Sequence, residues 1–295
     1  MKPKKTISLI LVALIFGFLF WKITNDFNQI KNIEWDFKAH TILLMLLVTL
    51  PGPIVNAFSW HLITKSLGSN IDLLENIRIW ILSSAARFIP GSIWQYAGRI
   101  YMLSQKGISK TLLSTGIILE AVLNLSVASA LVIVTLIFQN LPVPYVVHII
   151  ALSLLLLTFF TLIIFTGKRI TLVEYVTRTI LKKDFKLSPV RTEWLPVIVF
   201  SITLQHLLAG LSLFLMSQAV INLPLSSLPF FIGASATSWL IGYLTFLAPS
   251  GLGVREVSLA GLLTVYAPLP VTSLVAILFR LVSIASEAMS VLTIL

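Results

Sequence analysis

Long apolar segments separated by short polar loops make up most of the chain, and they predict helices that cross a membrane. Segments long enough to span a bilayer lie near residues 6–24, 41–63, 112–138, 146–166, 195–220 and 271–295. Two further apolar segments, 79–104 and 228–266, are interrupted by Ile-Pro-Gly-Ser and Ala-Pro-Ser-Gly-Leu-Gly sequences. The pattern predicts an all-α polytopic membrane protein, with residues 1–295 forming a single integral membrane domain.

The distribution of lysine and arginine predicts that the two interrupted segments turn back inside the membrane. Cytoplasmic loops are enriched in positive charge, which places residues 2–5 and the basic loop 167–193 in the cytoplasm. Counting crossings between these two points makes segment 79–104 begin and end on the cytoplasmic side, and segment 228–266 begin and end outside. We therefore expect about six spanning helices and two re-entrant broken-helix hairpins. Eight spanning helices are the alternative, because residues 229–247 alone are long enough to cross.

The two interrupted segments also resemble each other. Residues 87–99 read RFIPGSIWQYAGR and residues 245–257 read TFLAPSGLGVREV, so each has an aromatic residue, then proline, small residues and arginine. The crossing count gives them opposite orientations. This arrangement is typical of an inverted repeat, here with halves of approximately 41–138 and 195–295, in which the broken helices mark the binding site.

Composition narrows the possible functions. The chain is 57% hydrophobic and 11% charged, with a net charge of +10 and no cysteine. The basic residues are spread over loops that border apolar segments, which does not favour nucleic-acid binding. The sequence has no nucleotide-binding motif, no nucleophile motif and no metal-ligand spacing, and thiol chemistry is excluded. We expect a protein that is not an enzyme and that uses no cofactor and no metal.

Ionisable residues inside the apolar segments are the candidate functional residues. There are seven: Arg87, Arg99, Glu120, Arg255, Glu256, Arg280 and Glu287. A charge at this depth needs a partner, and the planar guanidinium group suits phosphate. One interpretation is that these residues pair with one another and hold the bundle together. Arg280 and Glu287, seven residues apart on one helix face, suit this role. The other is that the arginines at the breaks form an anion site with the N–H groups of the half-helices. Trp94 lies beside the first break, whereas His206 and most other tryptophans are interpreted as packing and interfacial residues.

The two motifs resemble those of the lysylphosphatidylglycerol synthase transmembrane family, which includes the flippase portion of the multiple peptide resistance factor. The likeness covers roughly residues 5–295, although this chain has Pro249-Ser250-Gly251 where the family often has Pro-Gly-Gly. The family's soluble aminoacyl-transferring domain has no counterpart here. The resemblance therefore implies a lipid-handling membrane unit without aminoacylation activity. It points to Arg87, Pro90, Gly91, Arg99, Pro249, Gly251, Gly253, Arg255 and Glu256, and to the polar positions Glu120 and Arg280.

The expected function is therefore flippase-like. The protein would move an anionic or zwitterionic phospholipid, or a lipid-linked intermediate, across the cytoplasmic membrane, with its N-terminus in the cytoplasm. The alternative is an accessory or scaffold protein that contacts a lipid-modifying enzyme or a glycosyltransferase through loop 167–193. Membrane lipids are the expected partners and nucleic acid is not; self-association into a homo-oligomer is left open.

Overall fold

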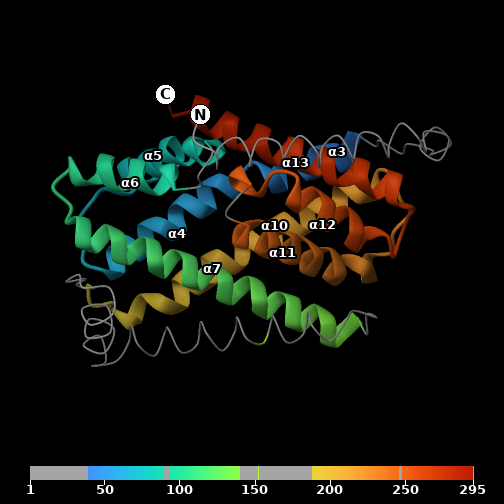
Figure 1. The fold of residues 1–295 in the computed structure, drawn as a ribbon, viewed down its shortest axis with the longest axis horizontal. Coiled ribbons are helices and arrows are strands. Elements are labelled where there is room, and N and C mark those ends of the chain that lie inside the picture. The colour runs from blue at the N-terminus through green and yellow to red at the C-terminus, as the bar shows by residue number, and fades with distance from the viewer. Residues whose placement is uncertain (1–38, 90–92, 140–151, 153–187, 246–247, 295) are drawn as a thin grey trace.

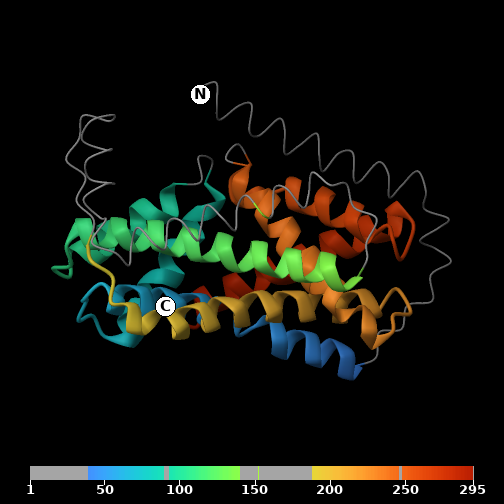
Figure 2. The ribbon, with the colours of Figure 1, turned by 90° about the horizontal axis from the view of Figure 1, so that it is seen from below.

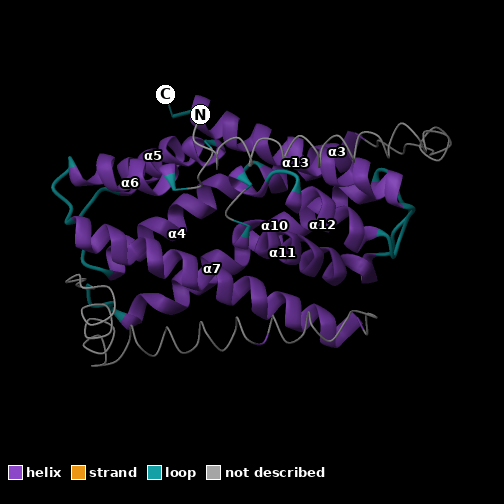
Figure 3. Ribbon diagram, viewed as in Figure 1, coloured by secondary structure: helices purple, strands orange, loops and turns teal. Residues whose placement is uncertain are grey.

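The computed structural model describes residues 39–89, 93–139, 152, 188–245 and 248–294. Within these ranges the chain forms helices and connecting loops and no strand, as Figure 3 shows. The predicted spans 6–24 and 146–166 (residue 152 apart), most of loop 167–193, and Pro90 and Gly91 lie outside the described residues.

The described helices follow one another in a simple order. The first half contains α3 (Ala39–Thr49), α4 (Gly52–Ser66), α5 (Leu73–Ser84), the 3-10 helix η1 (Ala85–Phe88), α6 (Trp94–Ser104) and α7 (Lys110–Gln139). The second half contains η2 (Thr192–Trp194), α10 (Leu195–Gln218), η3 (Leu225–Ser227), α11 (Leu228–Leu244), η4 (Pro249–Gly251), α12 (Val254–Leu263) and α13 (Leu269–Leu292).

Five helical segments of the described chain are long and apolar enough to cross a membrane. They are Leu43–Ser66, Lys110–Ile137, Thr192–Gln218, Leu225–Leu244 and Leu269–Leu292. Four of them match the spans predicted at 41–63, 112–138, 195–220 and 271–295. The predicted class, an all-α polytopic membrane protein, is confirmed. The fifth falls within 228–266, where the sequence predicts a re-entrant hairpin.

The first interrupted segment turns back on itself. Helix α5 has 12 residues and α6 has 11, so each is about 18 Å long or less, which is well short of a hydrocarbon core of about 30 Å. The two helices pack against each other and occupy the same half of the molecule in Figure 1. The two arms therefore form a hairpin, as the re-entrant prediction for residues 79–104 expects, and each arm is short for a span.

The second interrupted segment also forms a hairpin, with a longer first arm. Helix α11 runs toward the middle of the molecule and α12 returns beside it, in the half opposite to α5 and α6 (Figure 1). The view turned by 90° again places the teal residues of the first hairpin and the orange residues of the second at opposite ends (Figure 2). Since η1 contacts η4, the breaks of the two hairpins meet. The length of α11 would allow it to cross, so apolar length alone does not identify this hairpin.

The break between α3 and α4 shows how irregular backbone is accommodated within a predicted span. Pro53 has no N–H group, so the carbonyl of Thr49, four residues earlier, lacks its helical hydrogen bond. Ser286 of α13 donates its hydroxyl to that carbonyl at 3.1 Å. The Thr49 hydroxyl lies 2.6 Å from the hydroxyl of Ser212 on α10. Neighbouring helices therefore satisfy the freed backbone group, as a membrane interior requires.

Small residues let the second hairpin pack closely against its neighbours. A Cβ atom on Gly210 of α10 would lie 2.5 Å from the Cα atom of Ile232 on α11. A Cβ atom on Gly233 of α11 would collide with the side chain of Thr135 on α7. Close approach at glycine is the usual means of helix association in membranes, where lipid removes the hydrophobic driving force. These contacts fix α11 against α7 and α10.

Candidate functional site

A cavity of about 330 Å³ lies where the two hairpins meet. All seven of the ionisable residues singled out in the sequence line it: Arg87 of η1, Arg99 of α6, Glu120 of α7, Arg255 and Glu256 of α12, and Arg280 and Glu287 of α13. Five elements, three from the first half of the chain and two from the second, therefore place their charges in one cavity. The structure shows that the two interrupted segments and the charged positions of α7 and α13 belong to the same site.

The most deeply buried arginine, Arg99, is held by a carboxylate and by aromatic rings. Its Nη1 atom lies 2.7 Å from Oε2 of Glu120, and its side chain is 1% exposed. The indole of Trp80 donates to the other carboxylate oxygen at 3.1 Å. The guanidinium group also lies over the rings of Trp60 at 4.5 Å, Trp80 at 5.2 Å and Tyr96 at 5.9 Å. This arrangement is a structural ion pair, as the first of the two sequence interpretations expects.

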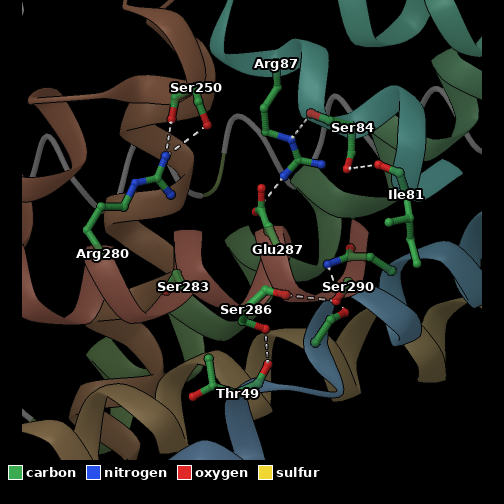
Figure 4. Close-up of polar contacts among 12 residues, drawn as sticks. Thr49, Ile81, Ser84, Arg87, Ser250, Arg280, Ser283, Ser286, Glu287 and Ser290 are labelled. Atoms are coloured by element: carbon green, nitrogen blue, oxygen red, sulfur yellow. Dashed lines mark hydrogen bonds and ion pairs between the residues drawn. The ribbon is translucent and has the colours of Figure 1, made fainter. Parts of the chain in front are cut away.

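The second pair joins the first hairpin to α13, and Figure 4 shows it. Nη1 of Arg87 lies 2.9 Å from Oε1 of Glu287, and the Arg87 Nε atom donates to the carbonyl of Ser84 at 3.1 Å. Both charged side chains are partly open, at 20% and 23% exposure. This pair is therefore the more accessible one to a ligand.

The third pair joins α13 to the second hairpin. Nη2 of Arg280 donates to the carbonyl and the hydroxyl of Ser250 at 3.0 and 2.9 Å (Figure 4). Its Nε atom lies 3.3 Å from Oε1 of Glu256, whose side chain is 1% exposed. Ser250 has a positive φ of 53°, a conformation that costs energy for a residue with a side chain. Arg280 holds this strained turn in place.

Arg255 differs from the other three arginines. Its guanidinium group makes no hydrogen bond and no ion pair with any residue that the structure describes, yet the side chain lines the cavity. Among the described residues, four arginines and three glutamates line this space, so one positive charge is in excess. Three arginines form structural pairs, as the first sequence interpretation expects, whereas the anion site of the second interpretation stays a prediction.

The remaining predicted site residues have different positions. Gly251 lines the cavity with a φ of 69°, and Gly253 has a φ of 84° as the residue before α12. Both therefore occupy left-handed conformations that favour glycine. Pro249 begins η4. The side chain of Trp94 is 48% exposed and does not line the cavity.

A neutral wall of the cavity was not predicted from the sequence. Its main members are Tyr96 on α6, Asn124 on α7, Gln205 and His206 on α10, and Trp239 and Tyr243 on α11. His206 was interpreted as a packing residue and Trp239 as an interfacial one, but both line the cavity. One signal was present: Trp239, Gly242 and Tyr243 are spaced three and four residues apart and share a helix face. Within the described ranges, no three His, Asp or Glu side chains lie close enough together to hold a metal ion.

The helices and the buried charged cavity define a multi-pass membrane protein with a polar site between two broken-helix hairpins. The chain belongs to the family described as the lysylphosphatidylglycerol synthase TM region, whose family model matches residues 6–286. The resemblance expected from the two motifs is therefore confirmed. No curated protein matches the chain.

Proposed function

We propose that this protein moves a phosphate-bearing lipid between the leaflets of the cytoplasmic membrane, with the headgroup passing through the cavity between the hairpins. The observation that carries the proposal is Arg255, a guanidinium group without a carboxylate partner among the described residues, in a cavity that already holds three paired arginines. An unpaired arginine at membrane depth is costly, and a phosphate bound by its planar fork offsets that cost.

The geometry assigns different roles to the charged residues. Arg255 binds the phosphate. Arg87 is the second contact, because its side chain is 20% exposed and can reach a phosphate while Nη1 stays on Glu287. Arg99 is too enclosed for this role, with 1% of its side chain exposed, and it fixes the cavity wall through Glu120. Glu287 stays paired with Arg87 and balances its charge.

The position of the cavity supports movement between leaflets. One hairpin enters from each half of the molecule, and η1 contacts η4 where they meet. A headgroup bound at this point lies between the two ends of the bundle. Binding sites at the meeting point of broken helices are typical of transporters built from inverted repeats.

A leaflet assay in proteoliposomes tests the proposal. Fluorescent phospholipid that moves to the outer leaflet is quenched by added dithionite, and the rate of that movement is the readout. We expect Arg255→Gln to slow it by about 10-fold or more, since a hydrogen bond to a charged group contributes about 1.5–3 kcal/mol. Arg78→Gln, which changes an exposed arginine on α5, is the matched control and should leave the rate unchanged.

Two outcomes would contradict the proposal. One is equal rates for the wild type and Arg255→Gln. The other is the absence of lipid movement together with a stoichiometric enzyme partner that co-purifies with the full chain. The second outcome would favour the accessory or scaffold function.

A further inference from the structure

A group of neutral polar and aromatic side chains lies directly beside Arg255. Trp239, Gly242 and Tyr243 share one face of α11, and all three line the cavity. The stem of Arg255 packs on Gly242, where an added Cβ atom would collide with the arginine Cγ atom. Ser238, one turn earlier than Gly242, donates its hydroxyl to the backbone carbonyl of Arg255 at 2.8 Å. Trp239 and Tyr243 therefore lie on the same helix face as Gly242, against which the stem of Arg255 packs.

The rings form an ordered platform. Trp239 and Tyr243 stack with ring centroids 4.8 Å apart and an angle of 17° between their planes. His206 meets the edge of Trp239 at 5.2 Å and 83°. The hydroxyl of Tyr243 lies 3.4 Å from that of Tyr96. Tyrosine and tryptophan combine a large apolar surface with a polar O–H or N–H group, which suits a ligand that carries both C–H and hydroxyl groups.

Two polar groups beside the platform lack partners. His206 is 3% exposed, and its Nε2 atom has no hydrogen-bond partner among the described residues. The same holds for the Oε1 atom of the neighbouring Gln205. Buried polar atoms are normally hydrogen-bonded, and an orphaned one costs free energy. Both side chains line the cavity, so a bound ligand is the available source of these hydrogen bonds.

The chemistry of this wall favours hydroxyl groups over an ammonium group. Amide, imidazole, phenol and indole groups are neutral and together both donate and accept hydrogen bonds, as hydroxyls do. Each of the three cavity glutamates lies against an arginine, so no carboxylate of the described lining is left for a cationic headgroup. The single excess positive charge matches the one negative charge of a phosphodiester.

We infer that the site selects a lipid whose headgroup is an uncharged hydroxylated group, such as glycerol or a hexose, joined through a phosphodiester. Gln205, His206, Trp239 and Tyr243 contact the hydroxylated part, and Arg255 contacts the phosphate. This inference rests on the proposed function only in that a lipid headgroup enters the cavity.

Lipid binding to the purified full chain, followed by native mass spectrometry, tests the inference without requiring transport. The protein is exposed to equal amounts of phosphatidylglycerol, phosphatidylethanolamine, phosphatidylcholine and phosphatidic acid. We expect phosphatidylglycerol to bind at least about fivefold better than each of the others, the effect of one neutral hydrogen bond. Equal or better binding of phosphatidylethanolamine or phosphatidylcholine would overturn the inference. A parallel arm with a polyprenyl-phosphate hexose shows which of the two hydroxylated lipid classes binds better.

Two variants test whether Gln205 and His206 cause the preference for phosphatidylglycerol. Gln205→Leu and His206→Phe should each remove about fivefold of the preference for phosphatidylglycerol while leaving phosphatidic acid binding unchanged. Gln218→Leu makes the same change on α10 outside the cavity lining and is the control. An unchanged preference in Gln205→Leu, the milder variant, would refute the assigned contacts. Selective binding without any lipid movement in proteoliposomes would refute the proposed function and leave this inference standing.

Discussion

The interpretation of Arg99 as a structural residue makes a strong prediction about Glu120. Glu120→Gln keeps a side-chain oxygen that accepts the hydrogen bond from Trp80, but it removes the negative charge. The guanidinium group of Arg99 then has no compensating charge at 1% exposure. We expect this single change to be among the most destabilising in the bundle.

The magnitude follows from the burial of the pair. Removing one partner of a buried ion pair costs about 3–5 kcal/mol, because the other charge is left uncompensated in a medium of low dielectric constant. The rings of Trp60, Trp80 and Tyr96 over the guanidinium group offset part of this cost. Such a cation–π interaction contributes about 0.5–2 kcal/mol. A loss of about 2–4 kcal/mol is therefore expected. Replacing both members, with Arg99→Met and Glu120→Leu together, should return stability to within about 1.5 kcal/mol of the wild type.

The measurement is the free energy of unfolding of the purified protein in mixed micelles titrated with sodium dodecyl sulfate. Glu75→Gln is the matched control, since Glu75 pairs with Lys106 at the surface, where the two side chains are 39% and 52% exposed. An exposed pair of this kind contributes at most about 1 kcal/mol. If Glu120→Gln costs no more than Glu75→Gln, Arg99 is not a buried structural cation, and the assignment of its role is refuted.

Two further predictions concern the second hairpin and the start of the first. Gly242→Ala should displace Arg255, lower stability by about 1–3 kcal/mol and slow lipid movement as much as Arg255→Gln, whereas Gly261→Ala, where a Cβ atom meets open space, should do neither. Asp72→Ala removes the side chain that accepts two backbone N–H groups at the start of α5, and should cost about 1 kcal/mol in the same detergent titration. A Gly242→Ala protein with wild-type lipid movement, or an Asp72→Ala protein with wild-type stability, would contradict the respective contact.

Much of the fold could be predicted from the sequence, because a bilayer constrains a chain strongly. Spanning helices must be apolar over about 20 residues, so four spans of the described chain were visible as apolar segments. The two breaks were visible as proline and glycine residues inside apolar segments. Irregular backbone at membrane depth needs a protein-lined polar interior, so the breaks also indicated where the site lies. What the sequence left open is the path of residues 229–247, which are long enough to cross; in the structure α11 ends at a break in the middle of the molecule.

The charged members of the cavity lining were likewise predictable, but the partner of each charge and the neutral wall were not. The expectation that Arg280 and Glu287 share a helix face is met, and both line the cavity. They bind different hairpins, however: Glu287 pairs with Arg87, 200 residues away, and Arg280 with Ser250 and Glu256. Helical periodicity determines the face on which a residue lies, and this much is local information.

Which carboxylate meets which arginine depends on how helices from distant parts of the chain pack, and only the tertiary structure decided it. The sequence by itself determined an all-helical membrane protein with seven ionisable groups at hydrocarbon depth. Within the part of the chain that the structure describes, tertiary packing divided the four arginines into three that are paired with glutamate and one, Arg255, that is not. That division has a physical origin: a buried charge is stabilised by the group that packing places within a few ångströms of it, whatever their separation in sequence.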